Sequence, residues 1–280
     1  MTEPTNDPRC PKWETTIEPC DKPRTLSVVI EDQLRPSQKS FHRPNILYTY
    51  MASKWAVANV VTLQLKLCDP SKTNDYLEFV WNLRSDKDSV QYRKEYSSKY
   101  NFLSLCQDPD NLLLWSYYAD RSKGICLGLS TALEHDFDDL LWPVQYSGTV
   151  DPFADKTRIE HNPEEVELIK RLFTTKRRIW EHEDEWRLIV PTNSPRVKSG
   201  PDGLRFFDIH PDELKEVYFG TNCAAIDIGR MALACLKIGA TPSFYKMEEN
   251  LDLLQLDSTR CDLSMLQGCM HIALLNGTTF

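Results

Sequence analysis

Three glutamates alternate with other residues between two tryptophans, in the segment Trp-Glu-His-Glu-Asp-Glu-Trp-Arg over residues 180–187. If the segment is extended, side chains two residues apart point to the same side, so Glu181, Glu183 and Glu185 share one face with Arg187. The tryptophans that bracket the run are expected to bury it in part. A carboxylate that loses its water beside an aromatic wall is a candidate functional group.

The same acidic run also has a structural interpretation. Like charges in a row on one face cost stability unless cations or ligand hydroxyls lie opposite, and Lys176, Arg177 and Arg178 stand close by in the sequence. A charge run is commonly a solvated segment, here an acidic loop leading into an edge strand with a Glu185–Arg187 pair. The residues alone leave both interpretations open.

A second group of candidate residues is aromatic. Ser104 is followed by Leu-Cys, and residues 114–124 then read Leu-Trp-Ser-Tyr-Tyr-Ala-Asp-Arg-Ser-Lys-Gly. Trp115 and Tyr118 of this segment could form a platform for a base or a sugar, or they could be core aromatics whose polar atoms reach the surface. The segment Thr-Asn-Asp-Tyr-Leu-Glu at residues 73–78 is most simply an Asx-type turn.

Several common catalytic motifs are absent from the sequence. It contains no Gly-x-Gly-x-x-Gly, Gly-Lys-Ser/Thr, Gly-x-Ser-x-Gly or His-Glu-x-x-His pattern, and its six histidines stand singly. Among the nine cysteines there is no Cys-x-x-Cys pair, and the nearest approach to a metal cluster, Cys261, Cys269 and His271, lacks a fourth ligand at a suitable spacing. We therefore predict no metal site and expect the cysteines to be reduced thiols, mostly buried.

The candidate residues need a scaffold of mixed strands and helices. Apolar alternation and β-branched or aromatic runs predict strands at residues 46–50, 63–67, 102–106, 124–129, 186–190, 204–209 and 217–219, and others near 243–247 and 252–256. Helices are expected at 53–60 with Ser53 as its cap, across 76–100, at 112–119, from a Thr131–Glu134 capping box, from Asn162 into the basic stretch at 176–178, and at 224–236 before Gly239. Without a strict strand–helix–strand rhythm, the fold class predicted is α+β, with a largely antiparallel sheet and flanking helices.

Composition and charge narrow the class of protein. The 280 residues carry 33 Lys and Arg against 41 Asp and Glu, a formal charge of −8, which argues against general nucleic-acid binding because that rests on clustered cations. No apolar run approaches the length of a membrane span and the chain opens without a secretory signal, so a cytoplasmic protein is expected. The predicted organisation is an irregular extension at residues 1–44, one domain at 45–257 and a tail at 258–280.

Taken together, these segments resemble a bacterial family known as domain of unknown function 2971. The matching motifs stand in the family's order: Leu-Tyr-Thr-Tyr at 47–50, Asn-Asp and Glu at 74–78, Ser-Leu-Cys at 104–106, Leu-Trp-Ser-Tyr-Tyr-Ala at 114–119, Lys-Gly-Ile-Cys at 123–126, residues 180–187, and Tyr-Phe-Gly at 218–220. The resemblance covers residues 45–250. Thr49, Tyr76, Cys106 and Leu114 depart from the family pattern.

The order of these motifs is also similar to the layout of ADP-ribosyltransferases. That resemblance implies an enzyme that cleaves NAD and transfers ADP-ribose to an acceptor not identified by the sequence, in a toxin or phage-defence context. It implies that Glu185 is the catalytic carboxylate and that Glu183 assists or activates the acceptor. Tyr48 or Tyr50 would hold NAD, Ser104 would support the site, and Trp115 and Tyr118 would add contacts to the cofactor.

Two other hypotheses compete with this one. A non-catalytic binding module would display Glu181, Glu183 and Glu185 on the surface for a basic partner, with no cleft. A hydrolase of nucleotides or nucleic-acid ends would gather Asp75 and Glu78 with the glutamates around one Mg²⁺. The geometry that separates them is whether Tyr48, Ser104 and Glu185 converge on one cleft.

Overall fold

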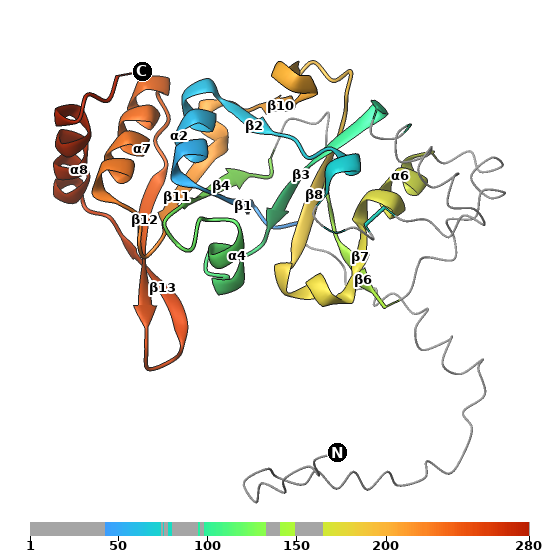
Figure 1. Ribbon diagram of the computed structural model, residues 1–280, viewed down its shortest axis with the longest axis horizontal. Helices are drawn as coiled ribbons and strands as arrows, with labels where there is room; N and C mark the ends of the chain where they lie inside the picture. The colour runs from blue at the N-terminus through green and yellow to red at the C-terminus, as the bar shows by residue number, and fades with distance from the viewer. Residues whose placement is uncertain are drawn as a thin grey trace, which may run out of the picture. The chain divides into compact units, whose positions relative to one another are not determined.

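The computed structural model of the protein describes residues 43–73, 75, 78–79, 95, 98–132, 141–148 and 165–279. The chain divides into two units, Met1–His42 and Arg43–Phe280, and all described residues belong to the second. This unit is an α+β domain, as predicted, built on a large and mostly antiparallel sheet with helices beside it (Figure 1).

The main sheet has eight strands in the order β13-β12-β11-β4-β1-β3-β8-β5. Neighbouring strands are antiparallel except β11 and β12, which are parallel and are connected through helix α7. In chain order the strands are β1 Ile46–Met51, β3 Tyr100–Cys106, β4 Ile125–Ser130, β5 Leu141–Pro143, β8 Glu185–Pro191, β11 Leu214–Phe219, β12 Ser243–Asn250 and β13 Gln255–Arg260.

Two small sheets and several short helices complete the domain. Strands β2 Gln64–Lys66, β10 Arg205–Asp208 and β9 Val197–Ser199 form one sheet, and β6 Gln145–Ser147 pairs in parallel with β7 Thr175–Arg177. The helices are α2 Ser53–Thr62, α4 Leu112–Tyr117, α6 Glu165–Thr174, α7 Ala225–Ile238 and α8 Leu263–Leu275, with short 3₁₀ turns η1 Pro70–Lys72, η3 Arg178–Glu183, η4 Pro201–Gly203 and η5 Pro211–Glu213.

One face of the main sheet packs into the apolar core. Alternate residues of its central strands point to this face, for example Leu47 of β1, Leu127 of β4 and Leu188 of β8, all fully buried. Helices α2, α7 and α8 lie side by side at this part of the domain (Figure 1). The helix α7 ends at Gly239, whose φ of 74° is the left-handed conformation that glycine adopts at little cost.

The intervening residues point to the opposite face of the sheet and are mostly polar or aromatic. On three successive strands they are Tyr48 and Tyr50 of β1, Ser104 and Cys106 of β3, and Glu185 and Arg187 of β8. Cross-strand pairing places Ser104 opposite Arg187 and Cys106 opposite Glu185. The two-residue alternation of strands therefore gathers the predicted motif residues on one face.

Strands β1 and β3 separate along their length. They pair at Tyr48 and Cys106, whereas β1 pairs with β4 along all six residues from Ile46 to Met51. The edge of β3 is instead bridged at Phe102 by Cys68, which follows β2. The main sheet therefore opens between β1 and β3, next to the motif residues.

Several details differ from the sequence predictions. Ser53 does not cap α2, because the cap position is Ala52 and the Ser53 hydroxyl donates to the Lys123 carbonyl at 2.7 Å. Strand β9 lies between the strands predicted at 186–190 and 204–209, where no element was expected. The segment assigned to a tail contains the end of β13 and helix α8, whose residues Leu266, Cys269 and Ala273 are buried. The helix expected at 76–100 and the Thr131–Glu134 capping box lie largely outside the described residues.

Within the described residues, no helix is long and apolar enough to cross a membrane.

Close packing of α7 on α8 predicts a position-specific effect of adding one methyl group. A Cβ at Gly229 would lie 2.0 Å from the Cys269 carbonyl oxygen of α8, so we expect Gly229→Ala to lower the free energy of unfolding by about 1–3 kcal/mol. Urea denaturation measures this change. Gly268→Ala on α8 is the control, because a Cβ at this position meets nothing within 4 Å. This substitution should stabilise the helix by up to about 1 kcal/mol. Equal effects of the two substitutions would contradict the packing described.

Candidate functional site

The opening between β1 and β3 is a pocket of about 400 Å³. Six of the seven residues predicted to form the site line it: Tyr48, Tyr50, Ser104, Tyr118, Glu183 and Glu185. The lining includes residues from both faces of β3, Ser104 from one and Leu103 and Leu105 from the other, because the strand edge is exposed where β1 turns away. The convergence required of Tyr48, Ser104 and Glu185 is therefore present, in a pocket of the size that small molecules occupy.

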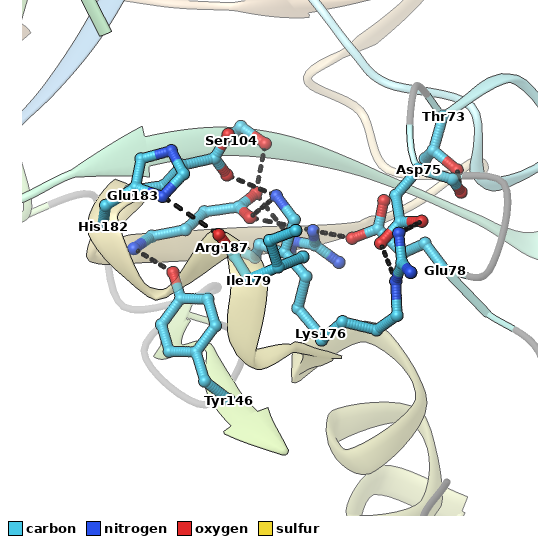
Figure 2. Close-up of polar contacts among 12 residues, drawn as sticks. Thr73, Asp75, Glu78, Ser104, Tyr146, Lys176, Ile179, His182, Glu183 and Arg187 are labelled. Atoms are coloured by element: carbon cyan, nitrogen blue, oxygen red, sulfur yellow. Dashed lines mark hydrogen bonds and ion pairs between the residues drawn. The ribbon is translucent and has the colours of Figure 1, made fainter. Parts of the chain in front are cut away.

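Glu185 is the first residue of β8 and the centre of a buried polar network. Its partners Ser104, Lys176 and Arg187 are labelled in Figure 2. Its Oε1 accepts hydrogen bonds from the Ser104 hydroxyl and from Arg187 Nε at 2.8 Å. Its Oε2 accepts from Lys176 Nζ at 2.8 Å and from Arg187 Nη2 at 2.9 Å. The Glu185 backbone N–H donates to the Tyr146 hydroxyl at 2.8 Å, which fixes the start of the strand.

The cations beside Glu185 determine its protonation state. Burial alone would raise the pKa of this carboxyl, since its side chain is 5% exposed. The charges of Arg187 and Lys176, together with their hydrogen bonds, outweigh burial and lower the pKa to about 2. Glu185 is therefore ionised at neutral pH, on the wall of the pocket.

Lys176 joins the two glutamates predicted to act together. Its ammonium group donates to Glu183 Oε2 as well as to Glu185, and the Tyr118 hydroxyl donates to Glu183 Oε1 at 2.7 Å. Burial opposes the charge of Lys176, but the neighbouring carboxylates, Glu185 foremost, raise its pKa overall. The sequence suggested Lys176 only as a partial offset to the acidic run, whereas it lies at the centre of the site.

Arg187 anchors a distant segment to the same network. Its Nη2 also donates to Glu78, its Nη1 donates to the Phe173 carbonyl at 2.7 Å, and its guanidinium carbon lies 4.4 Å from the centre of the Phe102 ring. Burial works against its charge, but Glu185 and Glu78 raise the pKa of the guanidinium. This is the Glu185–Arg187 pair of the structural interpretation, but β8 lies inside the sheet between β3 and β5 and the pair is buried.

Asp75 and Glu78 carry ion pairs as well as a turn, since the Glu78 N–H donates to the Asp75 carbonyl at 3.0 Å. Asp75 forms a two-point ion pair with Arg177, at 2.9 and 3.1 Å, and Glu78 is paired with Arg187 (Figure 2). Each of these carboxylates thus faces an arginine, instead of gathering with the glutamates around one Mg²⁺. Among the described residues, no three His, Cys, Asp or Glu side chains are arranged to hold a metal ion.

The extended conformation predicted for the whole acidic run is wrong before Glu185. Residues Arg178–Glu183 form the 3₁₀ turn η3, and Asp184 takes the left-handed conformation with φ of 41°, which aspartate tolerates better than most residues. The turn leaves Glu181 exposed and buries Glu183, so only two of the three glutamates belong to the pocket. The surface ledge expected of an interaction module is therefore confined to Glu181.

Of the predicted cofactor contacts, Trp115 does not line the pocket. It is fully buried, its indole N–H donates to the Pro109 carbonyl at 2.8 Å, and its ring packs edge-on against Tyr50 at 5.1 Å between centres. Trp115 therefore supports Tyr50 from below, and its side chain has no surface left for a ligand. Helix α4 turns the Trp115 side chain into the core. The aromatic residues that do line the pocket are Tyr50, Tyr118 and Trp180.

Tyr48 and Tyr50 are held by their hydroxyl groups. Tyr48 donates to Glu216 at 2.8 Å, and Tyr50 donates to the Asp108 carbonyl at 2.7 Å. Both residues line the pocket, while the Tyr48 ring packs edge-on against Tyr218 at 5.8 Å between centres and the Tyr50 ring packs against Trp115. Cys106, which stands where the family has serine, is buried, and burial raises the pKa of its thiol, so it is protonated at neutral pH.

Comparison of the chain with protein-family models, with curated proteins and with solved structures gives no match.

The low pKa of Glu185 predicts how stability depends on pH. A carboxyl whose pKa is lower in the folded protein than in the unfolded chain contributes stability above about pH 4, and that contribution disappears as the pH falls towards 2. We expect the wild-type protein to lose about 3 kcal/mol relative to Glu185→Gln between pH 5 and pH 2, measured by urea denaturation. A constant difference between the two proteins over this range would contradict the ionised state of Glu185.

Removal of the shared cation should be more damaging than removal of a surface one. Lys176→Met leaves Glu183 without its cation and Glu185 with Arg187 alone, so we expect a loss of about 3–5 kcal/mol in the free energy of unfolding. Lys198→Met is the matched control, since Lys198 is 54% exposed on β9 and its surface pair with Asp208 contributes up to about 1 kcal/mol. Similar losses in both variants would show that Lys176 does not neutralise the buried glutamates.

Proposed function

We propose that this protein binds NAD in the pocket between β1 and β3, cleaves its bond between ribose and nicotinamide, and transfers ADP-ribose to an acceptor. The observation that carries the proposal is an ionised carboxylate, Glu185, on the pocket wall, which accepts a hydrogen bond from the Ser104 hydroxyl. The motif order that resembles ADP-ribosyltransferases supports the same assignment.

The chemistry requires a fixed negative charge near the anomeric carbon. As the glycosidic bond breaks, its electron pair leaves with nicotinamide, which becomes neutral, and positive charge develops on the ribose. A preorganised carboxylate in a water-poor pocket stabilises that charge. The acceptor then forms a bond to the anomeric carbon and loses a proton, for which Glu183, within the same network, is the proposed base.

Ser104 gives the substrate a way to reach Glu185. Of the four hydrogen bonds to the Glu185 carboxylate, three come from Lys176 and Arg187, which also hold its charge. The fourth comes from the Ser104 hydroxyl, a neutral group that rotates freely about one bond. A ribose hydroxyl replacing it on Oε1 would keep Glu185 ionised and leave both cations in place.

The walls of the pocket suit a planar ring. Tyr50, Tyr118 and Trp180 line it, and Trp180 lies 5.3 Å from Lys176 Nζ, so its ring flanks the carboxylates. Aromatic faces stack on a nicotinamide or adenine ring and attract the positive charge of oxidised nicotinamide. Consumption of NAD by such an enzyme fits the toxin or phage-defence context that the resemblance implies.

A second candidate is a module that binds a nucleotide without cleaving it. The observation in its favour is that four protein donors already satisfy Glu185, as in a structural ion network. The two candidates share the ligand and differ in turnover.

The catalytic assignment predicts that Glu185→Gln lowers nicotinamide release from NAD by at least about 100-fold, because the developing positive charge loses its counter-charge. Release is measured by chromatography with the full chain and candidate acceptors, at a temperature where circular dichroism shows both proteins folded.

Glu181→Gln is the matched control, the same chemical change four residues away on an exposed side chain, and should leave the rate unchanged. NAD binding without turnover by the wild-type protein would favour the binding module. If the wild-type protein neither binds nor consumes NAD, the proposal is wrong.

A further inference from the structure

One end of the pocket is lined by residues that lie outside the motifs of the sequence analysis. Lys66 of β2, Lys72 of η1 and Arg205 at the start of β10 line it, together with Gly203 and Leu204. These residues come from the small sheet and the turn that follows it, and not from the strands that carry Tyr48, Ser104 and Glu185. Lys66, Lys72 and Arg205 each carry a positive charge.

Charge is unevenly distributed along the pocket. Its lining has five cationic and five acidic side chains, so it is balanced as a whole. At the Glu185 end, acids outnumber cations: Glu78, Glu183 and Glu185 share Lys176 and Arg187, and Asp75 has Arg177. At the other end, three cations accompany one acid, Asp69, which caps η1 through hydrogen bonds from the Ser71 N–H and hydroxyl at 2.8 and 2.7 Å and whose Oδ2 lies 3.9 Å from Lys72 Nζ. Cations remain in excess after this pair is counted. That end therefore favours an anion.

Arg205 is held in place by a buried partner. Its Nη1 donates to the Asn101 Oδ1 at 2.7 Å, and Asn101, which is 2% exposed, donates in turn to the Cys68 carbonyl at 3.2 Å. The Arg205 carbonyl accepts from the Leu67 N–H at 2.9 Å, which fixes its backbone beside β2. A guanidinium positioned in this way loses little freedom when it binds a phosphate, so its contribution to affinity is larger.

The two ends lie at a suitable separation for one ligand. Asn101, which holds Arg205, and Ser104, which bonds Glu185, are three residues apart on β3, or about 10 Å along the strand. Their side chains leave opposite faces of β3, and the pocket is lined from both faces where the edge of this strand is exposed. Both residues line the same pocket. A ribose at the acidic end can therefore carry its phosphate groups towards the cationic end.

We propose that Lys66, Lys72 and Arg205 form a phosphate-binding subsite that selects phosphorylated ligands over free nucleosides. The position of the ribose at Glu185 rests on the proposed function, whereas the phosphate subsite rests on the cationic lining. The ligand class is a nucleotide with at least one phosphate on its ribose, and a diphosphate gives the tightest binding because it meets more of the cations.

The test is calorimetric titration of the full chain with inorganic pyrophosphate, ADP-ribose and adenosine. We expect pyrophosphate and ADP-ribose to bind, adenosine to bind at least about tenfold more weakly than ADP-ribose, and the affinity for pyrophosphate to fall with added salt as screened charges require. The double variant Lys66→Met with Arg205→Gln should weaken pyrophosphate and ADP-ribose at least about tenfold, which corresponds to the loss of one charge-assisted hydrogen bond.

Controls separate this subsite from fold and from catalysis. Lys198→Met removes a cation from the same small sheet outside the pocket lining and should leave both affinities unchanged. Lys66→Met with Lys72→Met, two exposed positions, gives a second variant that keeps Arg205 and its contact with Asn101. Glu185→Gln should retain pyrophosphate binding.

Pyrophosphate binding that depends on Lys66 and Arg205, in a protein that does not consume NAD, would support the subsite and overturn the proposed function. NAD cleavage with unchanged affinities in both cationic variants would overturn the subsite and leave the proposed function standing. Equal affinity for adenosine and ADP-ribose, or no pyrophosphate binding by the wild-type protein, would also overturn the subsite.

Discussion

Burial of several charges at one point is the constraint on which the site depends. Glu78, Glu183 and Glu185 are each about 5% exposed, and isolated carboxylates at such positions would be costly, so each must be paired and hydrogen-bonded. Lys176 and Arg187 supply those partners from β7 and β8, and Ser104 adds one from β3. The network connects three strands and the segment around Glu78, which fixes the pocket wall at the place where β1 separates from β3.

Much of this arrangement could be predicted from local sequence patterns. The strands predicted at 46–50 and 102–106 contain Tyr48 and Ser104, and the one predicted at 186–190 begins next to Glu185. Strand pairing brings the three residues to one face of the sheet. Three features lay beyond such patterns. The turn η3 with its left-handed Asp184 removes Glu181 from the site, helix α4 turns Trp115 into the core, and α8 has apolar residues on all sides, so no amphipathic period marks it.

Residues that meet only through tertiary contacts could not be assigned from the sequence. Lys176 reaches Glu183 and Glu185 because β7 and η3 fold back on β8, and Arg187 meets Glu78 across 109 residues of chain. The cationic end of the pocket depends in the same way on β2 and β10, which pair although about 140 residues separate them. Motif order predicted which residues form the site, whereas the pairing of distant strands determines what they contact.

We propose that one ligand lies along this pocket with its ribose at Glu185. A crystal structure of the protein with a non-cleavable NAD analogue tests this position. We expect electron density for the nicotinamide ribose within hydrogen-bond distance of Glu185, with the Ser104 hydroxyl displaced, and density for the phosphates beside Arg205. Density for the analogue elsewhere on the protein, or a pocket in which Glu185 keeps its contacts and no ligand binds at saturating concentration, would contradict it.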